Sequence, residues 1–109
     1  MVRHISLFCF QEHPENGKTL EENIADMKAF LLKIPEMEPT ILHGEVGHAF
    51  DSARFTPDDA PVMFGQLVQI IDFATWEDAA AYVPSKAHTE LAQFSAPFLK
   101  KVIAIDYEI

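Results

Sequence analysis

Tyr82 and His88 are the two side chains of this sequence whose types and spacing could do chemistry. They lie six residues apart with Pro84 between them, so they belong to two successive short helical segments. A histidine at the start of a helix meets the positive end of the helix dipole, which disfavours imidazolium and leaves a neutral ring that can accept a proton. A tyrosine hydroxyl can donate to a developing enolate oxygen. Together they could supply the base and the donor of an enolisation or aldol step.

His4 and Asp106 form a second candidate pair. Both lie on segments predicted to be strands, and both are expected to face the helix side of the sheet. A buried aspartate can fix the tautomer of a histidine, as in a catalytic orienting pair. A structural interpretation stays open for both pairs, with His88 as a helix-start packing residue and Tyr82 as a core aromatic with a satisfied hydroxyl. His4 and Asp106 would then be a structural polar pair or a half-exposed strand end.

The remaining candidate metal ligands are not clustered. His43 and His48 are five residues apart, so on a regular strand they face opposite sides of the sheet, and His13 lies in a polar loop. Cys9 is the single cysteine, and we interpret it as a small buried hydrophobic side chain rather than as a nucleophile. We therefore predict no metal site, and the lack of a Gly-rich phosphate loop predicts no nucleotide cofactor.

Length, composition and charge narrow the class of protein. The chain has 109 residues, of which 49% are hydrophobic, enough for a single domain over residues 1–109 with a packed core. It carries 8 basic and 17 acidic residues, a formal net charge of -9, which argues against nucleic acids and anionic membranes as partners. No segment is apolar for long enough to span a membrane, and we find no signal peptide, so we expect a cytoplasmic protein.

The apolar pattern predicts four strands and two helical regions. Thr19 and Glu22 form a capping box, so a helix starts there, and Pro35 is expected to end it. Thr75 is expected to cap a short helix that Pro84 breaks. The predicted strands cover residues 2–10, 40–50, 62–73 and 100–109, and a last helix covers residues 87–98. This order predicts an α+β fold, the ferredoxin-like βαββαβ arrangement with a four-stranded antiparallel sheet.

The helices of this fold cover one face of the sheet, and the other face is too apolar to stay in water. Its expected members are Ile5, Leu7, Cys9, Val68, Ile70, Ile103, Ile105 and Tyr107. An exposed apolar patch of this kind usually marks an interface. We therefore predict a homodimer in which two sheets face each other. The alternative cover, the loop of residues 51–61, is too polar for that role.

Four short motifs carry a family resemblance. They are VRHISLF at residues 2–8, IPEM at residues 34–37, AAYVPSKAH at residues 80–88 and IDYE at residues 105–108. In this order and spacing they resemble the stress-responsive dimeric α/β-barrel (Dabb) family over essentially the whole chain. The resemblance implies a ferredoxin-like protomer, a dimeric α/β-barrel made by two sheets, and a pocket between sheet and helices in each protomer.

One plant member of that family, olivetolic acid cyclase, closes a linear polyketide thioester by aldol condensation. The positions that match its chemistry are Tyr82, His88 and His4, which the resemblance makes the candidate catalytic residues, with His4 in the wall of the pocket. Ser85 and Lys86 stand where the family usually has His-Pro, so the substrate does not carry over.

Two functions stay open. The first is a homodimer that binds a small hydrophobic or aromatic molecule without catalysis. The second is a cofactor-free cyclase, isomerase or monooxygenase that uses Tyr/His acid–base chemistry, and we expect no cofactor in either case. The expected ligand-binding residues are Ser6, Phe8, Ile24, Met27, Gln69, Ile71, Trp76, Leu91 and Asp106, with Trp76 also a candidate core aromatic.

Overall fold

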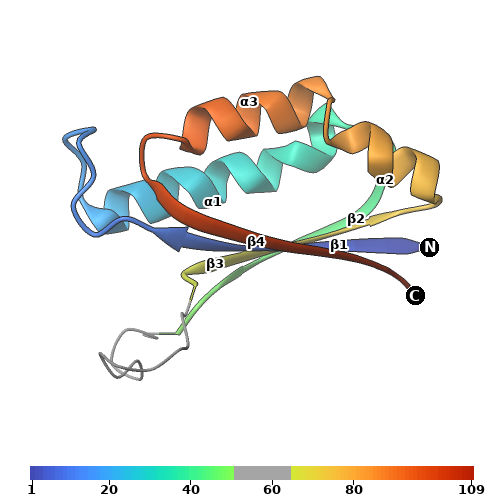
Figure 1. Ribbon diagram of the computed structural model, residues 1–109, viewed down its shortest axis with the longest axis horizontal. Helices are drawn as coiled ribbons and strands as arrows, with labels where there is room; N and C mark the ends of the chain where they lie inside the picture. The colour runs from blue at the N-terminus through green and yellow to red at the C-terminus, as the bar shows by residue number, and fades with distance from the viewer. Residues whose placement is uncertain (51–64) are drawn as a thin grey trace.

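The computed structural model describes residues 1–50 and 65–109, so the expectations for the 51–61 loop and for strand residues 62–64 lie outside the described residues. The elements are β1 (Val2–Phe10), α1 (Leu20–Met37), β2 (Ile41–His48), β3 (Leu67–Phe73), α2 (Trp76–Tyr82), α3 (Lys86–Ser95) and β4 (Leu99–Glu108). The strands form one antiparallel sheet in the order β2-β3-β1-β4, and the helices cover one of its faces (Figure 1). The predicted ferredoxin-like βαββαβ fold is confirmed.

The core lies between the sheet and the helices, with α1 supplying much of it. Because side chains alternate along a strand, Phe8 on β1 and Ile71 and Phe73 on β3 point to the helix side. They pack with Met27 and Ile34, which recur on one face of α1 at helical spacing. All five side chains are buried. A site between sheet and helices must therefore be built from the helix-side residues of the strands.

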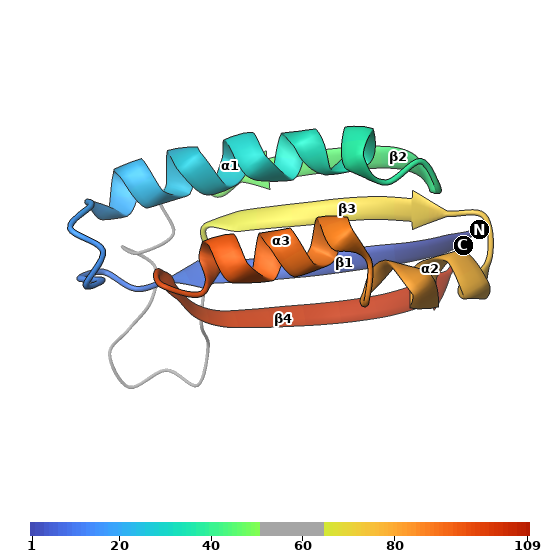
Figure 2. The ribbon, with the colours of Figure 1, turned by 90° about the horizontal axis from the view of Figure 1, so that it is seen from above.

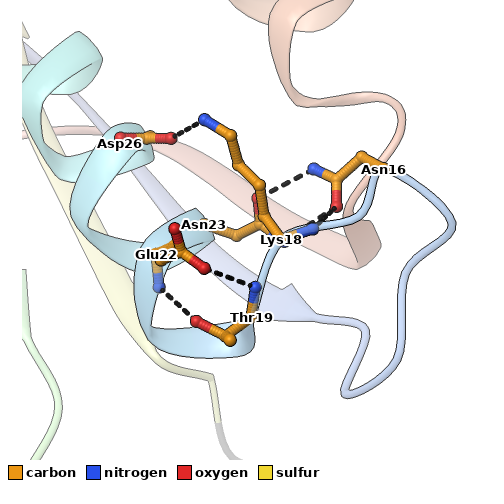
Figure 3. A network of polar contacts seen from close by, with 6 residues as sticks. All are labelled: Asn16, Lys18, Thr19, Glu22, Asn23 and Asp26. Carbon is orange, nitrogen blue, oxygen red and sulfur yellow. Dashed lines mark hydrogen bonds and ion pairs between the residues drawn. The ribbon is translucent and has the colours of Figure 1, made fainter.

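The first turn of α1 is fixed by the capping box that the sequence predicts. Thr19 Oγ1 accepts a hydrogen bond from the Glu22 N–H (3.1 Å), and Glu22 Oε1 accepts one from the Thr19 N–H (3.0 Å). Next to it, the Asn16 side-chain amide donates to the buried Asn23 (2.8 Å), which ties the preceding loop to the helix (Figure 3). These contacts set where α1 starts and hence which of its residues face the sheet.

Pro35 does not end α1, which corrects the sequence prediction. The helix continues to Met37, and the Glu38 N–H donates to the Ile34 carbonyl at its end (3.1 Å). Pro35 lies in the last turn, where its missing N–H removes a single backbone hydrogen bond. Its ring packs on β2, since a Cβ added at Gly44 would lie 2.8 Å from Pro35 Cγ. This close approach requires glycine at position 44.

A Gly44→Ala variant is expected to be less stable than the natural chain by about 1–3 kcal/mol, because the added methyl group overlaps the rigid Pro35 ring. Urea denaturation measures the difference in the free energy of unfolding. The double variant Pro35→Ala/Gly44→Ala removes the ring carbons that overlap, so it should recover most of the loss. A Gly44→Ala chain as stable as the natural one would show that the ring can move away without cost.

The opposite face of the sheet, which we call the helix-free face, lies away from all three helices (Figure 1), and Figure 2 shows them together above the other face. Its apolar members are Leu7, Ile103 and Ile105, which are exposed, and Ile5, Val68 and Ile70, which are partly buried. Cys9, also expected on this face, is a buried free cysteine. Among residues 1–50 and 65–109, no helix is both long and apolar enough to cross a membrane.

Candidate functional site

Two short helices hold the two residues that the sequence singles out first. Thr75 caps α2 by accepting a hydrogen bond from the Asp78 N–H (3.1 Å), and α2 ends at Tyr82. Ser85 caps α3 by accepting a hydrogen bond from the His88 N–H (3.2 Å), which places His88 in the first turn of α3. The junction between the two helices therefore brings the Tyr82 and His88 rings close together.

A chain of hydrogen bonds joins β4 to β1 on the helix side of the sheet. His4 and Asp106 are direct neighbours in the β1–β4 pairing, and His4 Nδ1 lies 2.5 Å from Asp106 Oδ1. His4 Nε2 lies 2.8 Å from the Ser6 hydroxyl. A carboxylate only accepts, so His4 donates through Nδ1, and in the neutral ring Nε2 accepts from Ser6. The exposed Asp106 thus fixes the tautomer of a largely buried histidine.

The Tyr82 ring lies between the two histidines. Its centroid is 5.9 Å from that of His4 and 5.1 Å from that of His88, both in edge-to-face arrangements, and 5.6 Å from that of Phe73. Tyr82 is only 1% exposed. The contacts with the histidines are made by ring edges and faces, because the Tyr82 hydroxyl has no hydrogen-bond partner among the described residues. The cluster of His4, Tyr82 and His88 is therefore packed rather than hydrogen-bonded.

Two buried donors of this region have no partner among the residues that the structure describes. They are the Tyr82 hydroxyl and Nε2 of Gln69, a β3 residue that is 1% exposed and pairs with Ser6 on β1. Burial raises the pKa of Tyr82 to about 12, and the nearby Gln69 side chain opposes that rise without meeting the geometry of a hydrogen bond. At neutral pH the hydroxyl is therefore protonated and can donate. A buried donor without an acceptor costs about 1–3 kcal/mol, so the pair favours an added acceptor.

A small cavity lies beside one of these donors, and an exposed stretch of β4 lies on the same side of the sheet. Gln69 lines a cavity of about 40 Å³ between α1 and the strands β2 and β3, enough for a water molecule or one polar group but less than an aromatic ring needs. Strand β4 lies beyond α3 (Figure 2). Its helix-side residues Val102, Ala104 and Asp106 are exposed. An apolar surface therefore borders the His4–Asp106 pair.

His88 is suited to accept a proton near neutral pH. Burial lowers the pKa of its imidazole, the nearby His4 lowers it further, and a hydrogen bond with the Val83 backbone opposes both effects. The ring is therefore neutral at pH 7. Burial is the largest of these effects on the pKa of His88.

The folded protein is expected to lose stability as the pH falls below about 6.5, the ordinary pKa of histidine in an unfolded chain. The folded-state pKa of His88 lies below that value, so the unfolded state binds the proton more tightly. The stability is fully present above this range and stops falling once His88 is protonated in the folded state too. Urea denaturation between about pH 8 and pH 5 should show a weaker pH dependence for His88→Gln, whereas His13→Gln, in a loop, should match the natural chain. An unchanged dependence in His88→Gln would assign the loss to another group.

The other residues expected to bind a ligand divide into two groups. Phe8, Ile24, Met27, Ile71 and Leu91 belong to the packed core between sheet and helices. The structure does not bring Trp76 into the cluster or the core. Trp76 is 47% exposed, and its indole N–H donates to Glu108 Oε1 at the end of β4 (3.0 Å), which holds the ring at the surface.

The sequence analysis missed one charged pair on the helix-free face. Arg3 Nε and Nη2 donate to the two carboxylate oxygens of Asp72 at 2.8 and 3.0 Å. The signal was an aspartate inside the mostly apolar strand of residues 67–73, with an arginine on a neighbouring strand. Among the described residues, no cluster of three or more His, Cys, Asp or Glu side chains could hold a metal ion.

Four antiparallel strands connected as βαββαβ, with the helices on one face of the sheet, define a ferredoxin-like fold. The chain belongs to the family of the Stress responsive A/B Barrel Domain (Dabb), whose family model matches residues 2–109. No curated protein matches the chain.

Solved structures share the fold across almost the whole chain. A dimeric protein of unknown function with a ferredoxin-like fold from Bacteroides fragilis has 21% sequence identity and a TM-score of 0.71, covering 99% of this chain and 95% of its own. The Arabidopsis thaliana protein At3g17210 has 20% identity and a TM-score of 0.74, covering 100% and 95%. A hydroxynitrile lyase from Passiflora edulis has 18% identity and a TM-score of 0.71, covering 99% and 92%. At these identities the likeness establishes the fold alone.

Proposed function

We propose that this chain forms a homodimer that binds a small apolar molecule carrying a carbonyl oxygen, between the sheet and the helices. The observation that carries the proposal is the pair of buried donors without a partner among the described residues, Tyr82 OH and Gln69 Nε2. Both can donate at neutral pH, and neither carries charge. A carbonyl oxygen has two lone pairs and can accept from two donors at once, which makes it the simplest complement.

The residues around the site favour a ligand that is apolar apart from its carbonyl group. Phe73 packs on Tyr82, and the exposed Val102 and Ala104 lie on the helix side of β4, where the helices leave it uncovered. The cavity beside Gln69 is too small for a ring. We therefore expect the carbonyl group to point inward and the apolar part of the ligand to lie along the uncovered side of β4.

The apolar residues of the helix-free face support the homodimer. Monomers rarely expose a continuous apolar patch of this kind, and a second copy would remove it from water. The Bacteroides fragilis protein is described as dimeric and has the same fold, which supports the same assembly here.

Acetophenone and ethylbenzene test the ligand class, because they have the same ring and nearly the same shape and differ by the carbonyl oxygen. Isothermal titration or NMR titration of the natural chain should give an affinity for acetophenone about tenfold higher, since one net hydrogen bond is worth about 1 kcal/mol. Equal affinities would contradict the carbonyl-binding site. Binding of neither compound would exclude a ligand of this size and class.

A cofactor-free acid–base enzyme is the second candidate function. The hydrogen-bonded chain Asp106–His4–Ser6 and the lowered pKa of His88 favour it, because such groups can hold and move a proton. The hydroxynitrile lyase from Passiflora edulis has the same fold and adds support for an enzyme.

Hydrogen–deuterium exchange at the methyl group of acetophenone distinguishes the two functions. In the enzyme, His88 removes a methyl proton, Tyr82 donates to the enolate oxygen, and a deuteron from D₂O returns to the carbon. NMR should then show exchange above the buffer rate that both His88→Ala and Tyr82→Phe abolish. Exchange at the buffer rate with binding intact would leave the binding protein as the function.

A further inference from the structure

Asn16 and Gly17 lie in the loop that joins β1 to α1, and both are exposed. Gly17 has a φ angle of 77°, and a Cβ added to it would meet no atom within 4 Å. Among residues 1–50 and 65–109, the Gly17 N–H has no hydrogen-bond acceptor. The Gly17 nitrogen is therefore open to solvent, and no hydrogen bond within the described chain holds its proton.

The Asn16 side-chain carbonyl is hydrogen-bonded in a way that favours attack on its carbon. Its Oδ1 accepts a hydrogen bond from the Lys18 N–H (3.1 Å), which makes an Asx turn, and it lies 3.5 Å from Asn23 Nδ2 (Figure 3). Donors at a carbonyl oxygen stabilise the negative charge that the oxygen gains when a nucleophile attacks the carbon. The backbone nitrogen of the next residue, Gly17, is an internal nucleophile for that carbon.

The reaction available to this pair is deamidation, to which asparagine is prone. The Gly17 nitrogen gives up its proton to solvent and bonds to Asn16 Cγ, which closes a succinimide ring. The Cγ–Nδ2 bond breaks, and the amide group takes a proton from solvent and leaves as ammonia. Water then opens the ring at either carbonyl, leaving aspartate or isoaspartate at position 16. The net reaction consumes water, releases ammonia and needs no oxidant or reductant.

Asn23, the other asparagine of the chain, is protected from the same reaction. It is 1% exposed and lies near the start of α1, where the helix fixes its backbone. The next residue is Ile24, whose β-branched side chain hinders the approach of its own backbone nitrogen to a ring. The chain therefore contains one asparagine that is open to deamidation and one that serves as an internal control.

The Asn16 amide is also the group that ties the loop to α1. Its Nδ2 donates to Oδ1 of the buried Asn23 (2.8 Å). A carboxylate at position 16 has no N–H to donate, so this buried acceptor would lose its donor, which is costly. In isoaspartate the backbone also gains a carbon atom, which displaces the Lys18 N–H that closes the turn. Either product therefore weakens the contact between the loop and the helix.

We propose that Asn16 is a deamidation site, and that loss of its side-chain amide releases the β1–α1 loop from the start of α1. Neither Asn16 nor Gly17 belongs to the His/Tyr cluster or to the apolar residues of the helix-free face. The inference therefore stands apart from the proposed function.

Mass spectrometry of protein aged in warm, mildly alkaline buffer tests the site. Trypsin cuts after Lys18 and so separates the two asparagines into different peptides. The account expects the peptide with Asn16 to gain the mass difference between NH₂ and OH, and the peptide with Asn23 to stay unchanged. Asn16→Gln, which keeps an amide but needs a larger ring, should not convert. No conversion in the folded chain overturns the proposal, and conversion in urea alone would show that the hydrogen bonds of Asn16 protect it.

Limited trypsin digestion of the native protein measures the release of the loop. Cleavage after Lys18 should be about fivefold faster in the aged protein than in the fresh one, because losing one net hydrogen bond raises the open population by about that factor. Asn16→Asp, which is one of the two products, should show the same change without ageing. Lys86 on α3, whose side chain is 87% exposed, is the control site and should be cut at an unchanged rate. Equal cleavage after Lys18 in fresh and aged protein would overturn the release of the loop.

Discussion

An Ile105→Asp variant is expected to be monomeric at concentrations where the natural chain is a dimer. Ile105 is 59% exposed in the single chain and lies on the helix-free face, next to Ile5 of β1. A carboxylate there would be buried against the apolar residues of a second copy without a partner. The dissociation constant should therefore rise at least about 100-fold, which corresponds to about 2.7 kcal/mol. Light scattering over a dilution series measures it.

Leu32→Asp is the matched control for this variant. Leu32 is 56% exposed, close to the value for Ile105, but it lies on α1, which covers the other face of the sheet. This variant should keep the mass of the natural dimer. If both variants dissociate, the effect comes from added charge rather than from the helix-free face. If neither does, the face is not the interface.

The double variant Tyr82→Phe/Gln69→Leu should lose the preference for acetophenone over ethylbenzene while the folded state becomes no less stable. It removes the two buried donors that lack a partner among the described residues and keeps nearly the same volumes. Removing such groups is expected to stabilise the chain by about 1–3 kcal/mol, since the cost of burying them disappears. Urea denaturation and ligand titration on the same samples measure the two effects.

Ile34→Val is the matched control, because it should lower stability and leave ligand preference unchanged. Ile34 is buried in the core on α1, so its truncation should cost about 0.5–1.5 kcal/mol and leave the acetophenone preference unchanged. A double variant that loses stability as well as the preference would mean that Tyr82 and Gln69 already satisfy each other in the folded protein. The binding site would then lose the observation on which it depends.

Local chemistry made most of the fold predictable from the sequence. The Thr19–Glu22 capping box forms as expected because both of its hydrogen bonds lie within one turn and need no tertiary contact. The prediction that Pro35 ends α1 was wrong because the outcome there depends on a tertiary contact. A proline in a last turn is tolerated when its ring packs elsewhere, and Gly44 of β2 provides that surface. Neither residue reveals the contact by itself, because it depends on how α1 docks on the sheet.

The part of the candidate site that lies on strands was predictable, because strand alternation determines which face each side chain is on. Alternation put His4, Ser6 and Asp106 on the helix side, and the pairing of β1 with β4 then joined them. Trp76 could not be placed in this way, because its ring turns toward Glu108, a contact between distant parts of the chain. The Arg3–Asp72 pair needed the register of β1 and β3, which no sequence pattern fixes on its own.

A crystal structure of the natural chain soaked with acetophenone tests the central claim most directly. The account predicts the ketone oxygen within hydrogen-bond distance of both Tyr82 OH and Gln69 Nε2, with the ring beside Val102 and Ala104 on the uncovered side of β4. An oxygen placed away from both donors, or a Tyr82 hydroxyl that donates to Gln69 with the ketone bound elsewhere, would contradict it.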